Sequence, residues 1–137
     1  MFTKNKPSIL IIDYDTAILQ VFTRIFKRKG YCVSVAAKGT EAIEKLNCNH
    51  FDVALIDSCL PDMEGTTLFS VIDRSSHSTV KIMLTGKALE LDGVFGADAI
   101  LGKPIQPEKL LGIIDSKLRN RNMESSELQT NQEEGSI

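Results

Sequence analysis

Apolar residues along the chain gather in five short runs that are separated by amphipathic stretches. The runs do not alternate strictly between apolar and polar positions, which is typical of strands covered on both faces in a parallel sheet. Several of them lead directly into a polar residue, such as Asp13 after the first run. We therefore predict five strands, at residues 8–12, 31–36, 51–57, 80–85 and within 97–104.

The stretches between these runs have the spacing of helices. The clearest one begins after Asp15 and Thr16, and its apolar residues at 18, 19, 22, 25 and 26 fall on one face. Its basic end, Lys27-Arg28-Lys29, complements the helix dipole, and Gly30 follows. The other predicted helices lie at 39–47 with Gly39 or Thr40 near the cap, 66 to about 74, weakly at 89–95, and 107–120.

Strands that alternate with helices in this way predict an α/β domain with a doubly wound, five-stranded parallel sheet. We expect one domain over residues 1–120. From 121 to 137 the chain is polar and nearly free of large apolar residues. This segment is expected to be a disordered tail or a frayed extension of the last helix.

Composition narrows the classes of function. A chain of 137 residues with 42% hydrophobic residues has the size of one soluble globular domain. The net charge of -2 gives no reason to expect direct binding to nucleic acid. Cys32, Cys48 and Cys59 lack the spacing of a zinc site, so we expect reduced thiols in the cytoplasm. No apolar run approaches the roughly 20 residues of a membrane span, and no export signal is recognised.

Polar side chains follow four of the predicted strands at their carboxyl ends, where open parallel sheets bind ligands. Two carboxylates at this edge can hold a divalent cation, while a hydroxyl and an ammonium can contact phosphoryl oxygens. Each residue alone has an ordinary structural explanation, but the ordered set predicts a phosphoryl site. The residues are Asp13, Asp57, Thr85 and Lys103.

The segments IIDYD, ALIDSCLPDMEG, IMLTG and LGKP resemble the response regulator receiver family of two-component signalling, from about residue 8 to residue 119. The resemblance implies a flavodoxin-like (βα)5 fold with Asp57 as the phosphoacceptor. It implies Mg²⁺ as the cofactor, held by Asp13, Asp57 and the backbone carbonyl of Cys59. A carboxylate nucleophile then attacks a phosphodonor in line while the cation neutralises charge on the transferring oxygens.

The same resemblance implies that Thr85 and Lys103 contact the phosphoryl group and that the Lys103-Pro104 peptide is cis. The leading hypothesis is a stand-alone receiver, because the sequence beyond Arg119 is not expected to form an output domain. Its partners would be a histidine kinase and a downstream protein. We expect no enzymatic activity beyond self-phosphorylation from a phosphodonor and autodephosphorylation.

The residue after Asp13 departs from the family, which usually carries a second acid where this chain has Tyr14. A neutral phenol contributes no charge, so we expect weaker affinity for Mg²⁺. Asp15 offers two interpretations. It could also reach the metal, since residues two apart in an extended segment share a side. We favour the other interpretation, in which Asp15 is the N-cap of the first helix.

Two further departures concern signalling. Ile100 stands where receivers commonly place a switching Tyr or Phe, so we do not expect the usual coupling of phosphate to the surface. The interval between Thr85 and Lys103 is shorter than the family's by roughly one helical turn, which predicts a shortened fourth helix. We therefore expect output through an altered surface, or through the first or last helix. A functional thiol at Cys59 is the less favoured alternative to its backbone role.

Two other functions are open. The first is a pseudo-receiver that is not phosphorylated and acts as a binding module, which Tyr14, Ile100 and the short helix-four region favour. The second is a haloacid-dehalogenase-like phosphatase that uses Asp13 as nucleophile and Asp15 as acid/base, because IIDYDT also resembles that motif. Against it, the chain passes from Asp15 directly into a helix without room for a flap.

The chain contains two histidines, His50 and His77, which matter because phosphorelays use histidine. Both lie in predicted loops, without a neighbouring helix face suited to docking another receiver. We expect them to be solvated surface residues.

Overall fold

The computed structural model describes residues 6–75, 78–86 and 96–135. It contains a five-stranded sheet of β1 (Ser8–Ile12), β2 (Cys32–Ala36), β3 (Val53–Asp57), β4 (Val80–Thr85) and β5 (Ala99–Gly102). The helices within the described residues are α1 (Thr16–Arg28), α2 (Gly39–Cys48), α3 (Thr67–Ser75) and α4 (Pro107–Gly135). The helix predicted at 89–95 lies outside the described residues, so its shortening stays a prediction.

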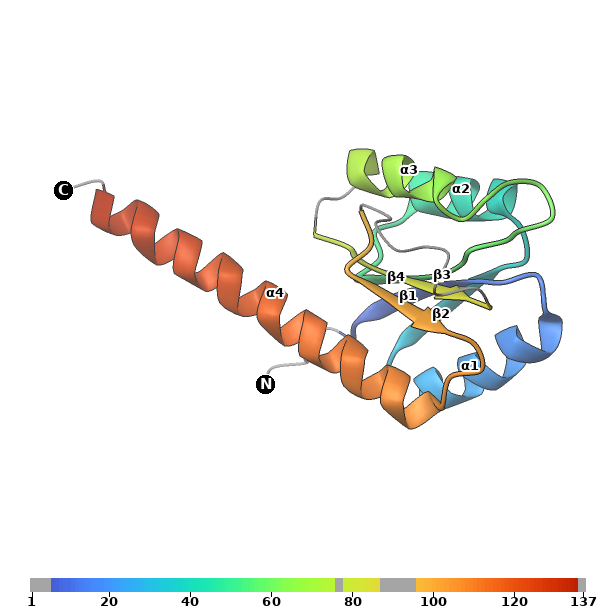
Figure 1. The fold of residues 1–137 in the computed structure, drawn as a ribbon. Helices are drawn as coiled ribbons and strands as arrows, with labels where there is room; N and C mark the ends of the chain where they lie inside the picture. The colour runs from blue at the N-terminus through green and yellow to red at the C-terminus, as the bar shows by residue number, and fades with distance from the viewer. Residues whose placement is uncertain (1–5, 76–77, 87–95, 136–137) are drawn as a thin grey trace.

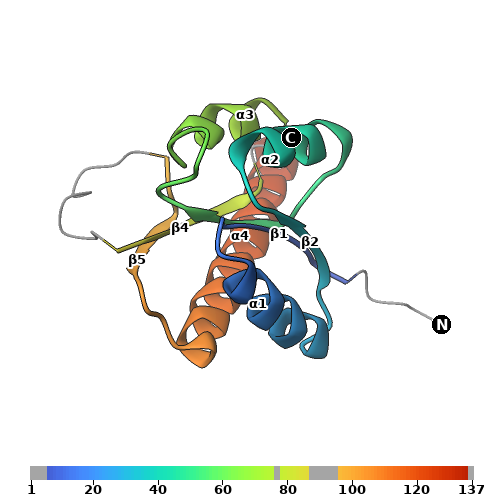
Figure 2. The ribbon, with the colours of Figure 1, turned by 90° about the vertical axis from the view of Figure 1, so that its right-hand side faces the viewer.

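The five strands are parallel and lie in the order β2-β1-β3-β4-β5. Helices α2 and α3 cover one face of this sheet, and α1 and α4 cover the other (Figure 1). The view turned by 90° shows the same two layers of helices (Figure 2). The doubly wound sheet predicted from the sequence is therefore confirmed. The chain changes direction along the sheet between β1 and β3, which makes their carboxyl ends the switch point at which such folds bind ligands.

Two apolar layers hold the helices against the sheet, because successive side chains of a strand point to opposite faces. On the α2 and α3 face, buried strand residues pack against helix residues such as Leu46, Leu68 and Ile72. On the α1 and α4 face, the partners include Phe26 and Leu110. Strands buried on both faces explain why the sequence runs are continuously apolar.

The first helix begins and ends as its sequence predicts. The Asp15 carboxylate accepts a hydrogen bond from the backbone N–H of Ala17 at 2.9 Å, so Asp15 is the N-cap. Beyond the basic last turn, Gly30 has a φ of +90°, a conformation that favours glycine. The capping interpretation of Asp15 is confirmed.

The last helix is longer than predicted, since α4 spans Pro107–Gly135 and continues beyond the sheet (Figure 1). Of the two expectations for residues 121–137, the helical extension describes the backbone as far as Gly135. Arg121, the first residue of that segment, still contacts the body of the domain through Asp52 and Ser78. A domain boundary at residue 120 stays a prediction. In the described part of the chain, no helix combines the length and apolarity needed to cross a membrane.

Candidate functional site

Three of the predicted site residues meet in one charged cluster. The Lys103 ammonium lies 2.8 Å from Asp13 Oδ2 and 3.4 Å from Asp57 Oδ1, so one cation lies between two carboxylates. Asp13 is buried, and the side chains of Asp57 and Lys103 are largely shielded from solvent. The sequence predicted this convergence from strand ends alone, although Asp13 and Lys103 are 90 residues apart.

The backbone of the sheet fixes where these side chains lie. Asp57 is the last residue of β3 and is in register with Leu84, next to Thr85 on β4. Thr85 pairs with Gly102 on β5, and its carbonyl oxygen accepts a hydrogen bond from the Lys103 N–H at 2.8 Å. Thr85 is buried. The structure therefore places the fourth predicted residue at the same sheet edge.

The turn after β1 holds Asp13 in place. Its backbone N–H donates to the carbonyl oxygen of Ala36 at 3.0 Å. One carboxylate oxygen, Oδ1, accepts from the Asp15 N–H at 2.9 Å, and the other accepts from Lys103. Asp13 and Asp15 therefore share the turn but differ in role, because Asp13 reaches the charged cluster and Asp15 caps α1.

The cluster is electrostatically unbalanced. Burial raises the pKa of the Asp57 carboxyl above its ordinary value, and the negative charge of Asp13 adds to this, against the opposing effects of the Cys59 N–H and Lys103. Burial alone would lower the pKa of the Lys103 ammonium. The hydrogen bond to Asp13 and the charges of both acids outweigh burial, so the pKa of Lys103 is raised. A site with one excess negative charge is suited to a cation.

The loop after β3, residues 58–65, brings backbone groups close to Asp57. The Cys59 N–H lies 3.3 Å from Asp57 Oδ1, and Cys59 itself is exposed. At the end of the loop, a Cβ on Gly65 would lie 2.2 Å from the carbonyl oxygen of Asp57, closer than real Cβ atoms come to backbone. Glycine at 65 therefore allows the loop to close against the strand that carries Asp57.

The donors at this edge fit the chemistry of Mg²⁺, which proteins commonly hold with one or two carboxylates while the remaining positions go to water and phosphate oxygens. Asp13 and Asp57 supply two such carboxylates. Tyr14 is 65% exposed, so its phenol lies out in solvent. Within the described residues, no group of three or more acidic, His or Cys side chains gathers as a metal site.

Two other sequence predictions concern residues near this edge. The Lys103-Pro104 peptide bond is cis, as predicted. Ile100 pairs with Met83 in the sheet and packs, half-buried, against the core on the α2 and α3 face.

Asp62, in the 58–65 loop, is not among the site residues that the sequence predicts. Its carboxylate oxygens accept hydrogen bonds from the backbone N–H groups of Gly39 and Thr40, at 2.8 and 3.0 Å, and so cap α2 from another part of the chain. The sequence prediction placed the cap of α2 near Gly39 or Thr40, but the N-cap position is Lys38, which makes no side-chain cap hydrogen bond. The only sequence signal for this cap is the presence of an acid, Asp62, in a loop that follows a neighbouring strand.

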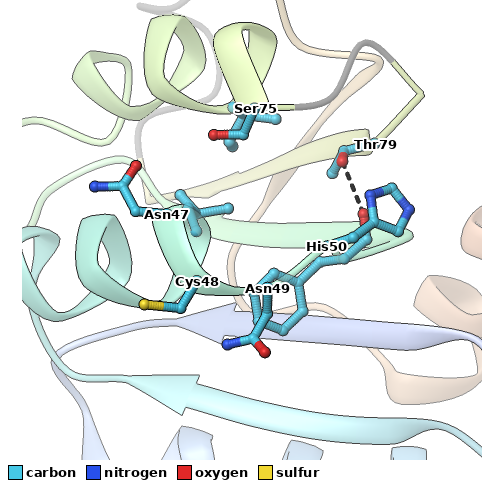
Figure 3. Close-up of a pocket in the computed structure, with 9 residues that line it drawn as sticks. Asn47, Cys48, Asn49, His50, Ser75 and Thr79 are labelled. Carbon is cyan, nitrogen blue, oxygen red and sulfur yellow. Dashed lines mark hydrogen bonds between the residues drawn. The ribbon is translucent and has the colours of Figure 1, made fainter.

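A hollow on the opposite edge of the sheet, with a volume of about 280 Å³, lies between the ends of α2 and α3 (Figure 3). Its lining includes Cys48, His50 and Thr79, whose hydroxyl donates to the Phe51 carbonyl at 2.7 Å. His50 is exposed, as predicted, and His77 lies outside the described residues. Because Asp13, Asp57 and Lys103 are at the carboxyl edge, this hollow is separate from the charged cluster.

Comparisons with known proteins identify the family. The family model described as response regulator receiver domain matches residues 9–115. The chain is 33% identical over 132 residues to the transcriptional regulatory protein CpxR of Escherichia coli (strain K12), covering 93% of this chain and 55% of that protein. It is 29% identical over 127 residues to the DNA-binding response regulator MtrA of Mycobacterium tuberculosis (strain ATCC 25618 / H37Rv), covering 90% and 55%.

The chain thus spans about half the length of these curated relatives. A crystal structure of a CheY-like response regulator receiver domain protein from Methanospirillum hungatei JF-1 matches with a TM-score of 0.80 and 38% identity. That match covers 88% of this chain and 99% of the other. With this fold and these relatives, the chain belongs to the response regulator receiver domain family of two-component systems.

Proposed function

We propose that this receiver domain accepts a phosphoryl group on Asp57 from a histidine kinase and then signals through contacts with a downstream protein. The observation that carries the proposal is the charged cluster, in which Lys103 lies between Asp13 and Asp57 at the switch point of the sheet. Structural stability alone does not call for two acids around one cation, because one acid would balance its charge.

The chemistry follows from the positions of these side chains. An Asp57 carboxylate oxygen attacks phosphorus, the bond between phosphorus and the kinase imidazole breaks, and that nitrogen keeps the electron pair. Asp13, Asp57 and the Cys59 carbonyl would hold Mg²⁺, and the ion would supply positive charge to the transferring oxygens. Lys103 is close enough to Asp57 to contact the phosphoryl group, and the Thr85 hydroxyl is proposed as its other donor.

The product is an acyl phosphate on the protein, so the domain is a phosphoacceptor and not an enzyme that turns over external substrates. Self-phosphorylation from a small phosphodonor and autodephosphorylation are the reactions expected of it. Three free, exposed cysteines suit a reducing compartment, and we propose a cytoplasmic location.

Incubation with acetyl phosphate and Mg²⁺, followed by intact mass spectrometry, tests the proposal. The wild type should gain the mass of one phosphoryl group, and Asp57→Asn should not. Asp13→Asn is the informative companion, because in the receiver it slows the reaction but leaves Asp57 as the modified residue. A phosphoryl group mapped to Asp13 would instead support a haloacid-dehalogenase-like phosphatase. That alternative is already disfavoured because α1 begins at Thr16, directly after Asp15.

The second candidate function is a pseudo-receiver that binds a partner without being phosphorylated. The exposed Tyr14, in place of a second acid, favours it, as does Ile100, which has no ring to switch. A wild-type chain that gains no mass at saturating Mg²⁺ and acetyl phosphate, while keeping its fold, would favour this module over the phosphoacceptor.

A further inference from the structure

The loop that follows Asp57 is tied to itself, so that its two ends move together. The Gly65 N–H donates to the Ser58 carbonyl at 2.9 Å, and the Leu60 N–H donates to the Met63 carbonyl at 3.1 Å. An isolated antiparallel bridge also joins Cys59 and Glu64. A shift at the tip of this 58–65 loop is therefore transmitted to Cys59, beside the Asp57 carboxylate.

The tip of the same loop is tied to α2. Both oxygens of Asp62 accept from the first turn of the helix, Oδ1 from the Gly39 N–H at 2.8 Å and Oδ2 from the Thr40 N–H at 3.0 Å. These N–H groups have no partner within the helix, and the N-cap residue Lys38 provides no side-chain cap. Asp62, 23 residues along the chain from Gly39, therefore accepts the hydrogen bonds of the first turn of α2, as the N-cap Asp15 does for α1.

Packing reinforces these hydrogen bonds. Gly39 is buried, and a Cβ built on it would lie 2.2 Å from the Met63 sulfur, so the Met63 side chain occupies the space that any larger residue at 39 would fill. Asp62 and Met63 together form a clamp between the loop and the start of α2. The N–H groups of Thr40 and Gly39 also lower the pKa of the Asp62 carboxyl, so it is ionised at neutral pH and suits the positive end of a helix.

We propose that Asp62 is a positioning residue for the phosphoryl site, which holds the Cys59 carbonyl and the Asp57 carboxylate in place by clamping their loop to α2. The proposal rests on the proposed function, in which that carbonyl and carboxylate bind Mg²⁺. The same contacts couple the start of α2 to the phosphoryl site. By linkage, a cation that needs the ordered loop stabilises the clamp, and the clamp strengthens cation binding by the same factor.

The test compares three variants of the full chain by Mg²⁺ titration and by amide hydrogen exchange. Asp62→Ala removes both acceptors and should weaken Mg²⁺ binding about fivefold, with Asp62→Asn between it and wild type. Glu64→Ala removes an exposed acid from the same loop and controls for charge, with less than a twofold effect expected. Asp52→Asn, at the far edge of the sheet, controls for general loss of stability and should leave Mg²⁺ affinity unchanged.

Hydrogen exchange separates the clamp from simple capping. In Asp62→Ala, exchange should become faster at the donors Gly39 and Thr40 and also at Leu60 and Gly65, which close the loop. Faster exchange confined to Gly39 and Thr40 would overturn the proposal, as would equal Mg²⁺ weakening in Asp62→Ala and Glu64→Ala. If the wild type neither binds Mg²⁺ nor gains a phosphoryl group, the proposed function fails, and with it the positioning role, whereas the exchange data still decide whether the clamp exists.

Discussion

Each edge of the sheet carries a cluster of acids and bases, and the two clusters are balanced differently. At the carboxyl edge, Asp13 and Asp57 share one cation, Lys103. At the amino edge, Asp52 faces Arg121, and the His50 imidazole also lies 3.6 Å from Asp52 Oδ1. The two clusters use the same kinds of side chain on the same sheet, so the difference between them lies in the number of charges and hydrogen bonds.

At the amino edge, the carboxylate of Asp52 has hydrogen-bond partners and an opposite charge. Asp52 Oδ2 accepts from the Ser8 N–H at 2.8 Å and from the Ser8 hydroxyl at 3.2 Å, and Arg121 Nη2 lies 3.3 Å from Oδ1. Arg121 also donates to the carbonyl oxygens of Asp52 and Ser78. Burial alone would raise the pKa of Asp52, but the Ser8 N–H and the Arg121 charge outweigh it and the pKa is lowered. This cluster joins β1, β3 and α4 and acts as a structural lock.

The carboxyl edge keeps an excess charge. Asp57 has a raised pKa because burial and the nearby Asp13 both disfavour its ionised form. Ionisable groups held in unfavourable surroundings are common at functional sites, because the incoming ligand relieves the imbalance. Both edges contain an acid–base pair. The candidate site differs in that its two carboxylates share a single cation, so one negative charge is left without a partner.

The largest expected effect comes from breaking the lock. Asp52→Asn removes the charge that faces Arg121 and weakens a hydrogen bond to the Ser8 N–H. Charge-assisted hydrogen bonds of this kind contribute roughly 1.5–3 kcal/mol each, and partial exposure reduces this, so we expect the free energy of unfolding to fall by about 2 kcal/mol. Urea unfolding at pH 7 measures it. A change below about 0.5 kcal/mol, the usual range for surface substitutions, would mean that the amino edge is no lock.

The same substitution at the carboxyl edge should have the opposite sign. Asp57→Asn removes a charge that its surroundings disfavour and relieves repulsion with Asp13, while Lys103 keeps its shorter contact to Asp13. Without Mg²⁺, we expect the free energy of unfolding to rise by about 1 kcal/mol, because the substitution removes the repulsion between two nearby carboxylates. Loss of stability in Asp57→Asn would show that the carboxyl edge is as well satisfied as the amino edge.

The free energy of unfolding should depend on pH in different ways for variants at the two edges. The folded pKa of Asp57 lies above its ordinary 3.8, so its ionisation costs stability at neutral pH, and this cost disappears as the pH falls through the folded pKa towards 3.8. The advantage of Asp57→Asn over wild type should therefore hold at neutral pH, shrink as the pH falls through the folded pKa, and be lost below about pH 3.8.

Asp52 behaves in the reverse way. Its folded pKa lies below 3.8, so its contribution is fully present above that pH and is lost only as the pH falls through the lower folded value. The cost of Asp52→Asn should persist to pH 4 while the gain of Asp57→Asn fades. Urea unfolding of both variants and wild type between pH 7 and pH 3.5 checks this, and parallel curves for the two variants would contradict the assigned directions.

Features that depend on a short stretch of sequence could be predicted. Local patterns predict the strands, the cap at Asp15 and the polar residues at strand ends. A parallel sheet then brings the strand ends together independently of the loop conformations. This is why Asp13, Asp57 and Lys103 could be grouped without a structure.

Contacts between distant segments could not be predicted in the same way. Asp62 caps a helix 23 residues earlier, and Arg121 reaches Asp52 across 69 residues. Neither pair leaves a periodic signal, because each depends on where two separate loops or helix ends lie. Because its neighbours are polar, the sequence places Arg121 in the predicted polar tail, although its side chain holds α4 against the sheet.

The smallest expected effect tests whether Tyr14 accounts for a weak metal site. Tyr14→Asp restores an acid beside Asp13, but the position is 65% exposed, so water screens the new charge. We expect Mg²⁺ to bind about threefold more tightly, equivalent to about 0.6 kcal/mol, and the metal-free protein to lose a little stability through added repulsion at the carboxyl edge.

Tyr14→Asn is the matched control, because it changes size and polarity in the same way without adding charge. Titration with Mg²⁺, followed by amide chemical shifts, compares the two variants with wild type, and added salt should reduce the gain of Tyr14→Asp because exposed charges are screened. If Tyr14→Asp binds no more tightly than Tyr14→Asn, the charge at position 14 does not reach the cation. The excess charge of Asp13 and Asp57 would then set the metal affinity of this edge by itself.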